Sequence, residues 1–188
     1  MKKTIVPAAL FILLCAVPAA AESPSGKIYA GSSLAGFSAS TLSGAGAFYQ
    51  FLITETFSIK ATGLWYMNKK EKTNINYPGE TRHYERLFWD AGGEIQKTVF
   101  SFKMADAGFE SYFLIGGSYW HSTPHDAFDR EDNFNNKRYA LGLGAGARLT
   151  IASRIFADVS VTYQYTRYLS KINEYAGLGC GCSAGIIF

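Results

Sequence analysis

The chain has 188 residues, enough for one domain, and its 18 basic and 15 acidic residues leave a small positive net charge. A balance so close to neutral provides no strongly basic surface, so we expect no nucleic-acid partner. After the first 21 residues no stretch has the roughly 18 or more apolar residues that a membrane-spanning helix needs. A role in a membrane would therefore have to be carried by strands.

The N-terminus predicts a cleaved signal peptide. A positively charged start precedes an apolar run over Ile5–Val17, and Ala19–Ala21 provide a cleavage site of small residues. We expect residues 1–21 to be removed and residues 22–188 to form a single barrel domain. Cys15 allows the alternative of a lipoprotein, although it lacks the small preceding residue usual at a lipidation site.

The mature sequence alternates apolar and polar residues with a period of two, the pattern of strands whose two faces have different surroundings. The predicted strands cover approximately 27–37, 44–53, 57–67, 84–100, 109–120, 138–151, 155–166 and 175–188. Short turns at 54–56, 103–108 and 152–154 alternate with connections at 38–43, 68–83, 121–136 and 167–174, most of them longer and polar. An even number of strands with this asymmetry is typical of an outer-membrane barrel.

Glycines decide which face of the predicted sheet points outward. A soluble barrel would have an apolar lining, whereas a membrane barrel has an apolar exterior. The less apolar face of strand 138–151 carries Gly142, Gly144 and Gly146, which would weaken the strand if they faced water. Turned inward, they leave room for large side chains in an interior only just wide enough to be filled. The large residues predicted to point inward are Phe48, Phe88, Tyr112 and Trp120.

Aromatic residues on the other face gather toward the two ends of the strands. Trp65, Trp89, Tyr119, Tyr139, Tyr163 and Tyr165 lie near the long-loop end, and Phe51, Phe57, Phe109 and Phe188 lie near the short-turn end. Two aromatic belts flanking an apolar band are typical of lipid interfaces. We therefore predict an all-β fold, an eight-stranded antiparallel up-and-down transmembrane β-barrel with short periplasmic turns and longer extracellular loops.

A polar network is predicted inside the barrel. Counting across the turn at 152–154 sets Arg148 opposite Asp158, and counting around Glu55 sets Gln50 opposite Lys60. The charged residues predicted to line the lumen are Lys60, Asp90, Glu94, Glu110, Arg148 and Asp158. We favour a filled interior in which these charges satisfy one another over a narrow pore that they would gate.

Two predicted loops of opposite charge are candidates for interaction at the cell surface. The basic loop contributes Lys69, Lys70 and Lys72, and the acidic loop contributes His121, His125, Asp126, Asp129 and Asp132. These residues would meet an extracellular ligand, or the two loops would attract each other and close the mouth of the barrel.

Catalysis or metal binding by the acidic loop is the less favoured interpretation. His121 and Ser122 raise the possibility of a surface hydrolase, but no second strand supplies a base-orienting partner. Metal binding by His121, His125 and Asp129 would need a helical turn, which Pro124 opposes. We expect no catalytic residue, no metal and no cofactor.

The closing strand, Tyr175–Phe188, alternates small or apolar residues with glycines and ends on an aromatic residue. Its Cys180 and Cys182 point the same way, about 6.5 Å apart, near the outer limit for a disulfide, so we expect two free thiols facing lipid. With the signal peptide and the eight alternating strands, this ending resembles the small eight-stranded outer-membrane barrels of the OmpA transmembrane-domain, opacity-protein and OmpW kind.

The resemblance implies location in the cell outer membrane, contact with outer-membrane lipid, and recognition of Phe188 by the barrel-assembly machinery as an insertion signal. It implies little about activity. We expect a non-enzymatic role in membrane structure or surface interaction, as in an adhesin. The alternatives are a narrow porin-like channel for small solutes and a rim hydrolase acting on lipid or peptide.

Overall fold

The computed structural model describes residues 31–73, 81–104, 106–122, 136–169 and 173–188. The predicted signal peptide and its cleavage site lie outside these ranges. Within them, no helix has the length and apolar character needed to cross a membrane.

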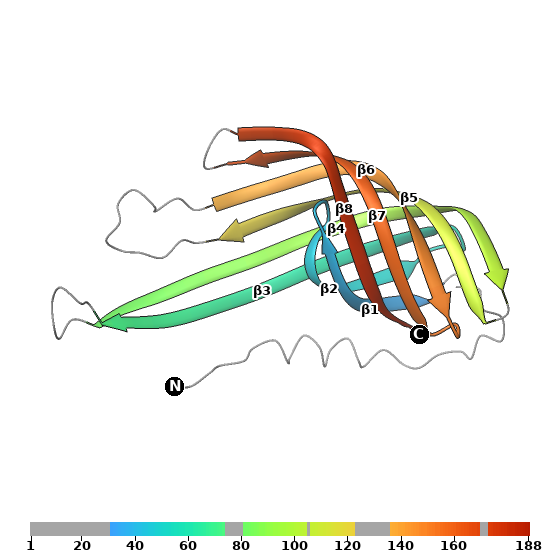
Figure 1. The fold of residues 1–188 in the computed structure, drawn as a ribbon, viewed down its shortest axis with the longest axis horizontal. Coiled ribbons are helices and arrows are strands. Elements are labelled where there is room, and N and C mark those ends of the chain that lie inside the picture. The colour runs from blue at the N-terminus through green and yellow to red at the C-terminus, as the bar shows by residue number, and fades with distance from the viewer. Residues whose placement is uncertain (1–30, 74–80, 105, 123–135, 170–172) are drawn as a thin grey trace.

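Eight antiparallel strands close into one barrel in the order of the sequence (Figure 1), which confirms the predicted fold. The strands are β1 (Ser33–Ser40), β2 (Gly44–Leu52), β3 (Phe57–Thr73), β4 (Thr81–Met104), β5 (Ala107–Ser122), β6 (Asn136–Ile151), β7 (Ile155–Tyr168) and β8 (Asn173–Ile187). The barrel closes where β1 pairs with β8, and the backbones of Ser33 and Phe188 exchange hydrogen bonds of 2.8 and 2.9 Å.

The alternation of apolar and polar residues in the sequence corresponds to alternation of outward and inward side chains in the barrel wall. Along β7 every second residue from Phe156 to Thr166 is buried in the lumen, and every second residue from Ile155 to Tyr165 is exposed on the outside. The exposed set is apolar or aromatic and the buried set is mostly polar, the reverse of a soluble barrel.

The stagger of the strands sets the width of the lumen. Following paired residues once around the wall from Phe37 leads through Ala47, Gly63 and the later strands to Glu174 on β8. Phe37 itself pairs with Ala184, so the register shifts by 184 − 174 = 10 residues around the barrel. With eight strands this corresponds to a strand tilt of roughly 40° and an interior that side chains fill.

The β3–β4 hairpin is longer than the sequence predicted. Most of the predicted loop at 68–83 is strand, because the ladder continues to the pair formed by Thr73 and Thr81. The register of this ladder sets Lys69 opposite Glu85 and Lys72 opposite Arg82. Lys69, Lys70 and Lys72 are therefore strand residues, and their prediction as loop residues was wrong.

Other boundaries differ from the prediction as well. The connections predicted at 103–108 and 167–174 are shorter, because β4 ends at Met104 and β5 begins at Ala107, and β7 ends at Tyr168 and β8 begins at Asn173. β5 runs to Ser122, so His121 and Ser122 also belong to a strand and not to the acidic loop. β1 covers Ser33–Ser40, whereas the predicted strand at 27–37 begins outside the described residues and ends too early.

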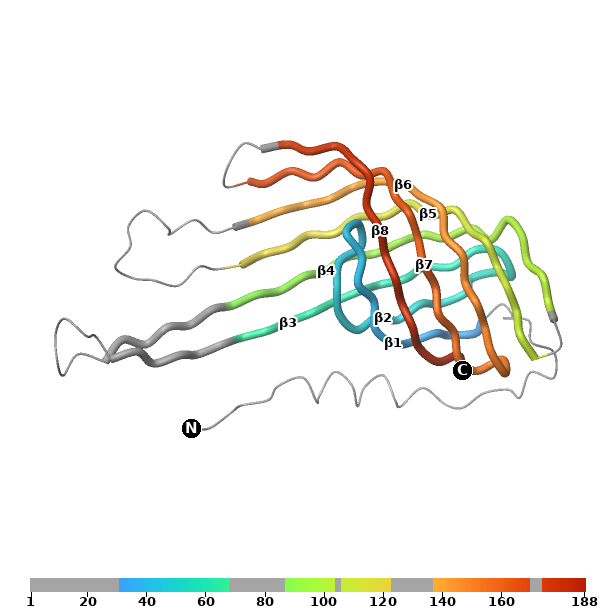
Figure 2. The backbone as a smooth tube through the Cα atoms, in the orientation of Figure 1, coloured from blue at the N-terminus to red at the C-terminus, as the bar shows by residue number. Residues whose placement is uncertain are grey.

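The β1–β2 hairpin is short, and its tip turns into the barrel (Figures 1 and 2). Gly44 and Gly46 at the start of β2 have φ angles of 84° and 134°, a backbone that other residues rarely adopt. A side chain at Gly92 would strike the carbonyl of Ser43, and one at Gly179 would strike the hydroxyl of Thr41. Inward glycines on β4 and β8 thus make room for the tip.

Apolar side chains fill the lumen around the hairpin. One cluster, toward the short-turn end, contains Leu34, Phe48, Leu52 and Phe156, and a second contains Leu42, Tyr112 and Leu114. Leu42, at the hairpin tip, is fully buried, so the tip closes the lumen in place of a loop in water. The sequence analysis identified neither Leu42 nor Phe156 as part of the core.

Candidate functional site

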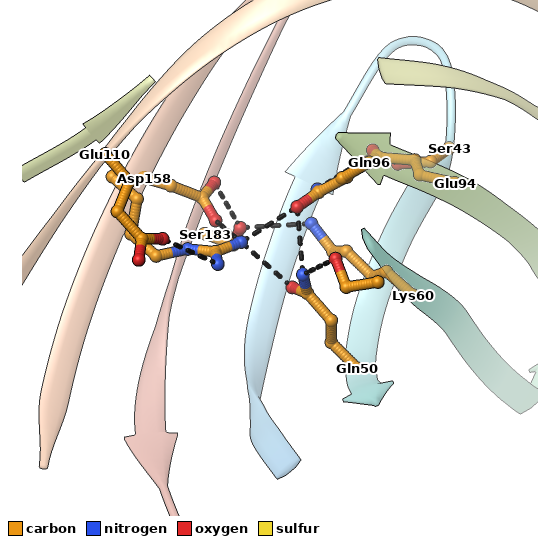
Figure 3. A network of polar contacts seen from close by, with 10 residues as sticks. Ser43, Gln50, Lys60, Glu94, Gln96, Glu110, Asp158 and Ser183 are labelled. Atoms are coloured by element: carbon orange, nitrogen blue, oxygen red, sulfur yellow. Dashed lines mark hydrogen bonds and ion pairs between the residues drawn. The ribbon is translucent and has the colours of Figure 1, made fainter. Parts of the chain in front are cut away.

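The central feature of the lumen is the guanidinium of Arg148 on β6. Figure 3 shows its partners Gln50, Gln96, Glu110 and Asp158 facing one another across the lumen. Its Nη2 donates hydrogen bonds to Oε1 of Gln50 at 3.1 Å and to Oε1 of Gln96 at 2.8 Å. Its nitrogens also lie 3.6 Å from a carboxylate oxygen of Glu110 and 3.7 Å from one of Asp158. The cation is therefore held by four side chains from four other strands.

A second cation, Lys60 on β3, is tied into the same network. Its Nζ donates to Oγ of Ser183 at 3.0 Å, and that hydroxyl donates to Oδ1 of Asp158. The ammonium also lies 4.7 Å from the ring centroid of Phe48. Asp158 thus links both buried cations, which lowers the cost of burying each.

Two lumenal carboxylates bind the hairpin tip. The hydroxyl of Ser43 donates to Glu94, and Glu94 also accepts a hydrogen bond of 2.7 Å from Nε2 of Gln96. Higher in the lumen, Asp90 accepts a hydrogen bond of 3.1 Å from the backbone N–H of Ala45. These carboxylates fix the β1–β2 hairpin in the lumen.

All six charged residues assigned to the lumen from the sequence lie on the inner face, but they do not form a single cluster. Lys60, Glu110, Arg148 and Asp158 belong to the network around Arg148, Glu94 joins it through Gln96, and Asp90 lies apart at the hairpin. The sequence analysis did not assign a role to Gln96 and Ser183, which connect the charges. Their strand parity, the same as that of Glu94 and Gly181, was the signal that could have identified them.

The network leaves the middle of the barrel filled. Arg148 lies between the rings of Tyr112 and Phe156, 5.4 and 5.5 Å from their centroids, so apolar groups close the space beside the polar ones. Hydrogen bonds cross the lumen from β6 to β2 and β4. This arrangement can stabilise a closed barrel.

The candidate hydrolase residues are separated by the strand. His121 packs its ring against Trp89, with 5.8 Å between centroids, whereas Ser122 is buried. Adjacent residues of a strand point to opposite faces, so these two side chains cannot act as a nucleophile and its base. His125, Asp126, Asp129 and Asp132 lie outside the described residues. Among the side chains that the structure places, no group of three His, Cys, Asp or Glu residues could hold a metal ion.

The outer face carries the features of a lipid-facing wall. Ring centroids of Trp89 and Tyr119 are 5.1 Å apart, and those of Tyr139 and Tyr165 are 6.3 Å apart, which forms a belt toward the long-loop end. On β8, Cys180 and Cys182 are free thiols exposed on this face.

A closed up-and-down barrel with an apolar exterior and a filled polar lumen defines a small membrane-spanning β-barrel. Residues 8–181 match the family described as the outer membrane protein beta-barrel domain, and the chain belongs to this family. Membership places the protein in an outer membrane. The N-terminal β-barrel domain of Pseudomonas aeruginosa OprF is a similar solved structure, with a TM-score of 0.43 and 14% identity over 84% of this chain and 96% of that one. No curated protein matches the sequence significantly.

Proposed function

We propose that this protein acts without catalysis at the cell surface, as an outer-membrane anchor that presents the β3–β4 hairpin to an extracellular ligand. The observation that carries this proposal is the reach of the hairpin. Among the residues that the structure describes, the segments 68–73 and 81–86 pair only with each other, and β4 pairs with β5 from Phe88 onward (Figure 1).

The composition of this segment indicates the class of ligand. Residues 68–86 contain five Lys or Arg residues and three Asp or Glu residues, a net positive charge beyond the barrel wall. A positively charged projection attracts anionic partners over roughly 8–10 Å at physiological salt. An anionic polymer at a cell surface is therefore the ligand class proposed, which is an adhesin-like role.

The filled lumen supports this role over that of a porin-like channel. A channel would need Arg148 and its partners to leave the lumen, at the cost of unpairing buried charges. We expect the protein in planar bilayers to give no discrete, ion-selective openings. Regular openings in the purified protein would favour the channel instead.

The proposal includes a route to the membrane. Residues 1–21 act as a cleaved signal peptide, and the closing strand with Phe188 is recognised by the barrel-assembly machinery. Outer-membrane lipid then surrounds the folded barrel.

Heparin is a suitable probe for the surface role. Vesicles containing the full-length protein should bind heparin-agarose, and replacement of residues 69–85 by a short Asn-Gly turn should abolish this binding. The triple substitution Lys69→Gln, Lys70→Gln and Lys72→Gln is the matched variant that keeps the hairpin. Binding that is equal for all three proteins would contradict the proposal.

A further inference from the structure

The barrel wall has an opening on one side. β1 pairs with β8 no further than Ser40 and Gly181, and β2 pairs with β3 no further than Ala47 and Gly63. β3 and β8 continue past these points, paired only with β4 and β7 (Figure 2). In the described part of the chain, therefore, no strand separates the outer halves of β3 and β8. Two absent strands correspond to three interstrand spacings, roughly 14 Å.

The exposure of side chains on β3 changes where the opening begins. On the inner face, Thr62 is 5% exposed, but the next two inward residues, Leu64 and Tyr66, are 39% and 52% exposed. The outward residues Trp65 and Met67 are exposed as well. The four consecutive residues from Leu64 to Met67, all apolar or aromatic, are thus exposed on both faces of the strand, beyond the last residue of β3 that pairs with β2.

The opening lies at the level of the lipid interface. Trp65, on its β3 edge, pairs with Trp89, a member of the aromatic belt. On the opposite edge, Leu178 is 74% exposed and Cys180 is exposed on the outer face. Such belts lie at the boundary between hydrocarbon and headgroups, so lipid is the molecule available to the opening.

Charge distinguishes between two possible occupants. The unpaired edge of β3 would be a template for a strand of a second copy, but Lys69, Lys70 and Lys72 follow directly on that edge, and edge lysines oppose such pairing. The same lysines suit an anionic headgroup located just outside the hydrocarbon. An apolar stretch followed by a basic stretch matches a molecule with an apolar chain and an anionic head.

We propose that the opening between β3 and β8 is a lateral binding site for an anionic amphiphile of the outer leaflet. Its chain lies against Leu64 and Tyr66, above a floor made by the β1–β2 hairpin, and its headgroup lies toward Lys69, Lys70 and Lys72. This site goes beyond the proposed surface role and does not depend on binding of an extracellular ligand.

Photo-crosslinking tests the chain-binding part with three leucines of the same size. A diazirine analogue of leucine replaces Leu64 at the opening, Leu114 in the closed lumen or Leu143 on the outer face of β6, in vesicles of phosphatidylglycerol and phosphatidylcholine with tritiated chains. We expect labelling by lipid at positions 64 and 143 and none at 114. The proposal would be overturned if lipid did not label position 64 any more than position 114, or if position 64 crosslinked only to a second copy of the chain.

The headgroup is tested in the same vesicles. The ratio of phosphatidylglycerol to phosphatidylcholine captured should be higher at position 64 than at position 143. Lys69→Gln, Lys70→Gln and Lys72→Gln together should lower the ratio at position 64 to that at position 143, which remains unchanged. The upper limit of this decrease is about a hundredfold, since each lysine near an anionic surface contributes about fivefold. Equal ratios at the two positions would overturn the anionic assignment.

Competition with free palmitate distinguishes between a single-chain fatty acid and a two-chain lipid as the source of the bound chain. Competition by palmitate for labelling at position 64 would identify a single-chain fatty acid as sufficient, and lack of competition would identify a two-chain lipid. Heparin binding, measured on the proteins with the leucine analogue alone, reports on the surface role separately, because these proteins keep Lys69, Lys70 and Lys72.

Discussion

The inward glycines of β8 lie in a crowded part of the lumen. A side chain at Gly179 would meet the hydroxyl of Thr41 and would lie 2.8 Å from the side-chain oxygens of Gln164 and Thr162. The neighbouring Cys180 is exposed on the outer face.

Gly179→Leu should therefore prevent the hairpin tip from seating. Overpacking of this kind costs about 1–3 kcal/mol, and more where the backbone cannot move. The folded fraction, measured as the band that shifts on boiling in a gel, should fall sharply. Cys180→Ala with Cys182→Ala is the matched change on the outer face and should leave the folded band unchanged. Normal folding of the leucine variant would contradict the seating of Thr41 beside β8.

Arg148 offers a second test at the residue scale. Arg148→Met leaves the partly buried Glu110 without its cation and leaves Asp158 linked only to Lys60, through Ser183. Breaking a buried pair from one side costs about 3–5 kcal/mol. The urea concentration at half-unfolding should fall by a corresponding amount. Adding Glu110→Gln should restore part of the loss, because it removes the carboxylate left without a cation while Asp158 still has Lys60. A double variant no more stable than the single one would argue against charge pairing as the role of this network.

The position of Arg148 could be predicted because a three-residue turn fixes the register of β6 and β7, and strand parity then sets Arg148 opposite Asp158. The bridging roles of Gln96 and Ser183 could not, since they depend on which strands face each other across the lumen. That information lies in the stagger of the whole barrel and not in any single hairpin.

Among the elements, the β1–β2 hairpin departs most from what its sequence predicts. A connection rich in Ser, Thr and Gly is ordinarily a turn in water, yet Leu42 at its tip is buried. The inward bend depends on two glycines with positive φ and on Gly92 across the lumen, so it is a tertiary effect that local patterning does not show.

Gly46→Ala tests this bend. With φ at 134°, an added Cβ is strained and would strike the carbonyl of Gly63, and we expect a loss of at least about 1–2 kcal/mol in urea unfolding. Gly63→Ala is the matched control, because its Cβ would meet nothing closer than the Asp90 carbonyl at 3.8 Å. Alanine suits a strand better than glycine, so this control should be neutral or slightly stabilising. Equal effects of the two substitutions would show that the bend does not need the special backbone of Gly46.

The prediction of a basic loop was wrong for a different reason. Its polar composition was read as irregular structure, but the backbone pairing of two antiparallel strands in water needs no apolar face. The charges in the ladder are mixed, with Lys69 opposite Glu85 and Lys72 opposite Arg82. Outside the bilayer, polarity alone does not distinguish a loop from a ladder.

At the scale of the whole molecule, two parts have different tasks. The closed part holds all eight strands in a ring with a register shift of 10 residues, from Glu174 to Ala184, and its filled lumen supplies the packing. Beyond the hairpin tip only β3 to β8 continue, which creates both the lateral opening and the projecting β3–β4 hairpin. A single short hairpin thus determines both surface features.

This division predicts that the projecting hairpin can be removed without loss of the barrel. Among the described residues, β3 from Asn68 and β4 up to Arg86 pair only with each other, so replacing residues 69–85 with an Asn-Gly turn removes none of the strand pairs of the closed ring. The boiled and unboiled forms should still separate on a gel, with an unfolding midpoint close to that of the full chain. A variant that no longer folds would show that the hairpin contributes to barrel assembly, and the loss of heparin binding could then not be assigned to a missing contact surface.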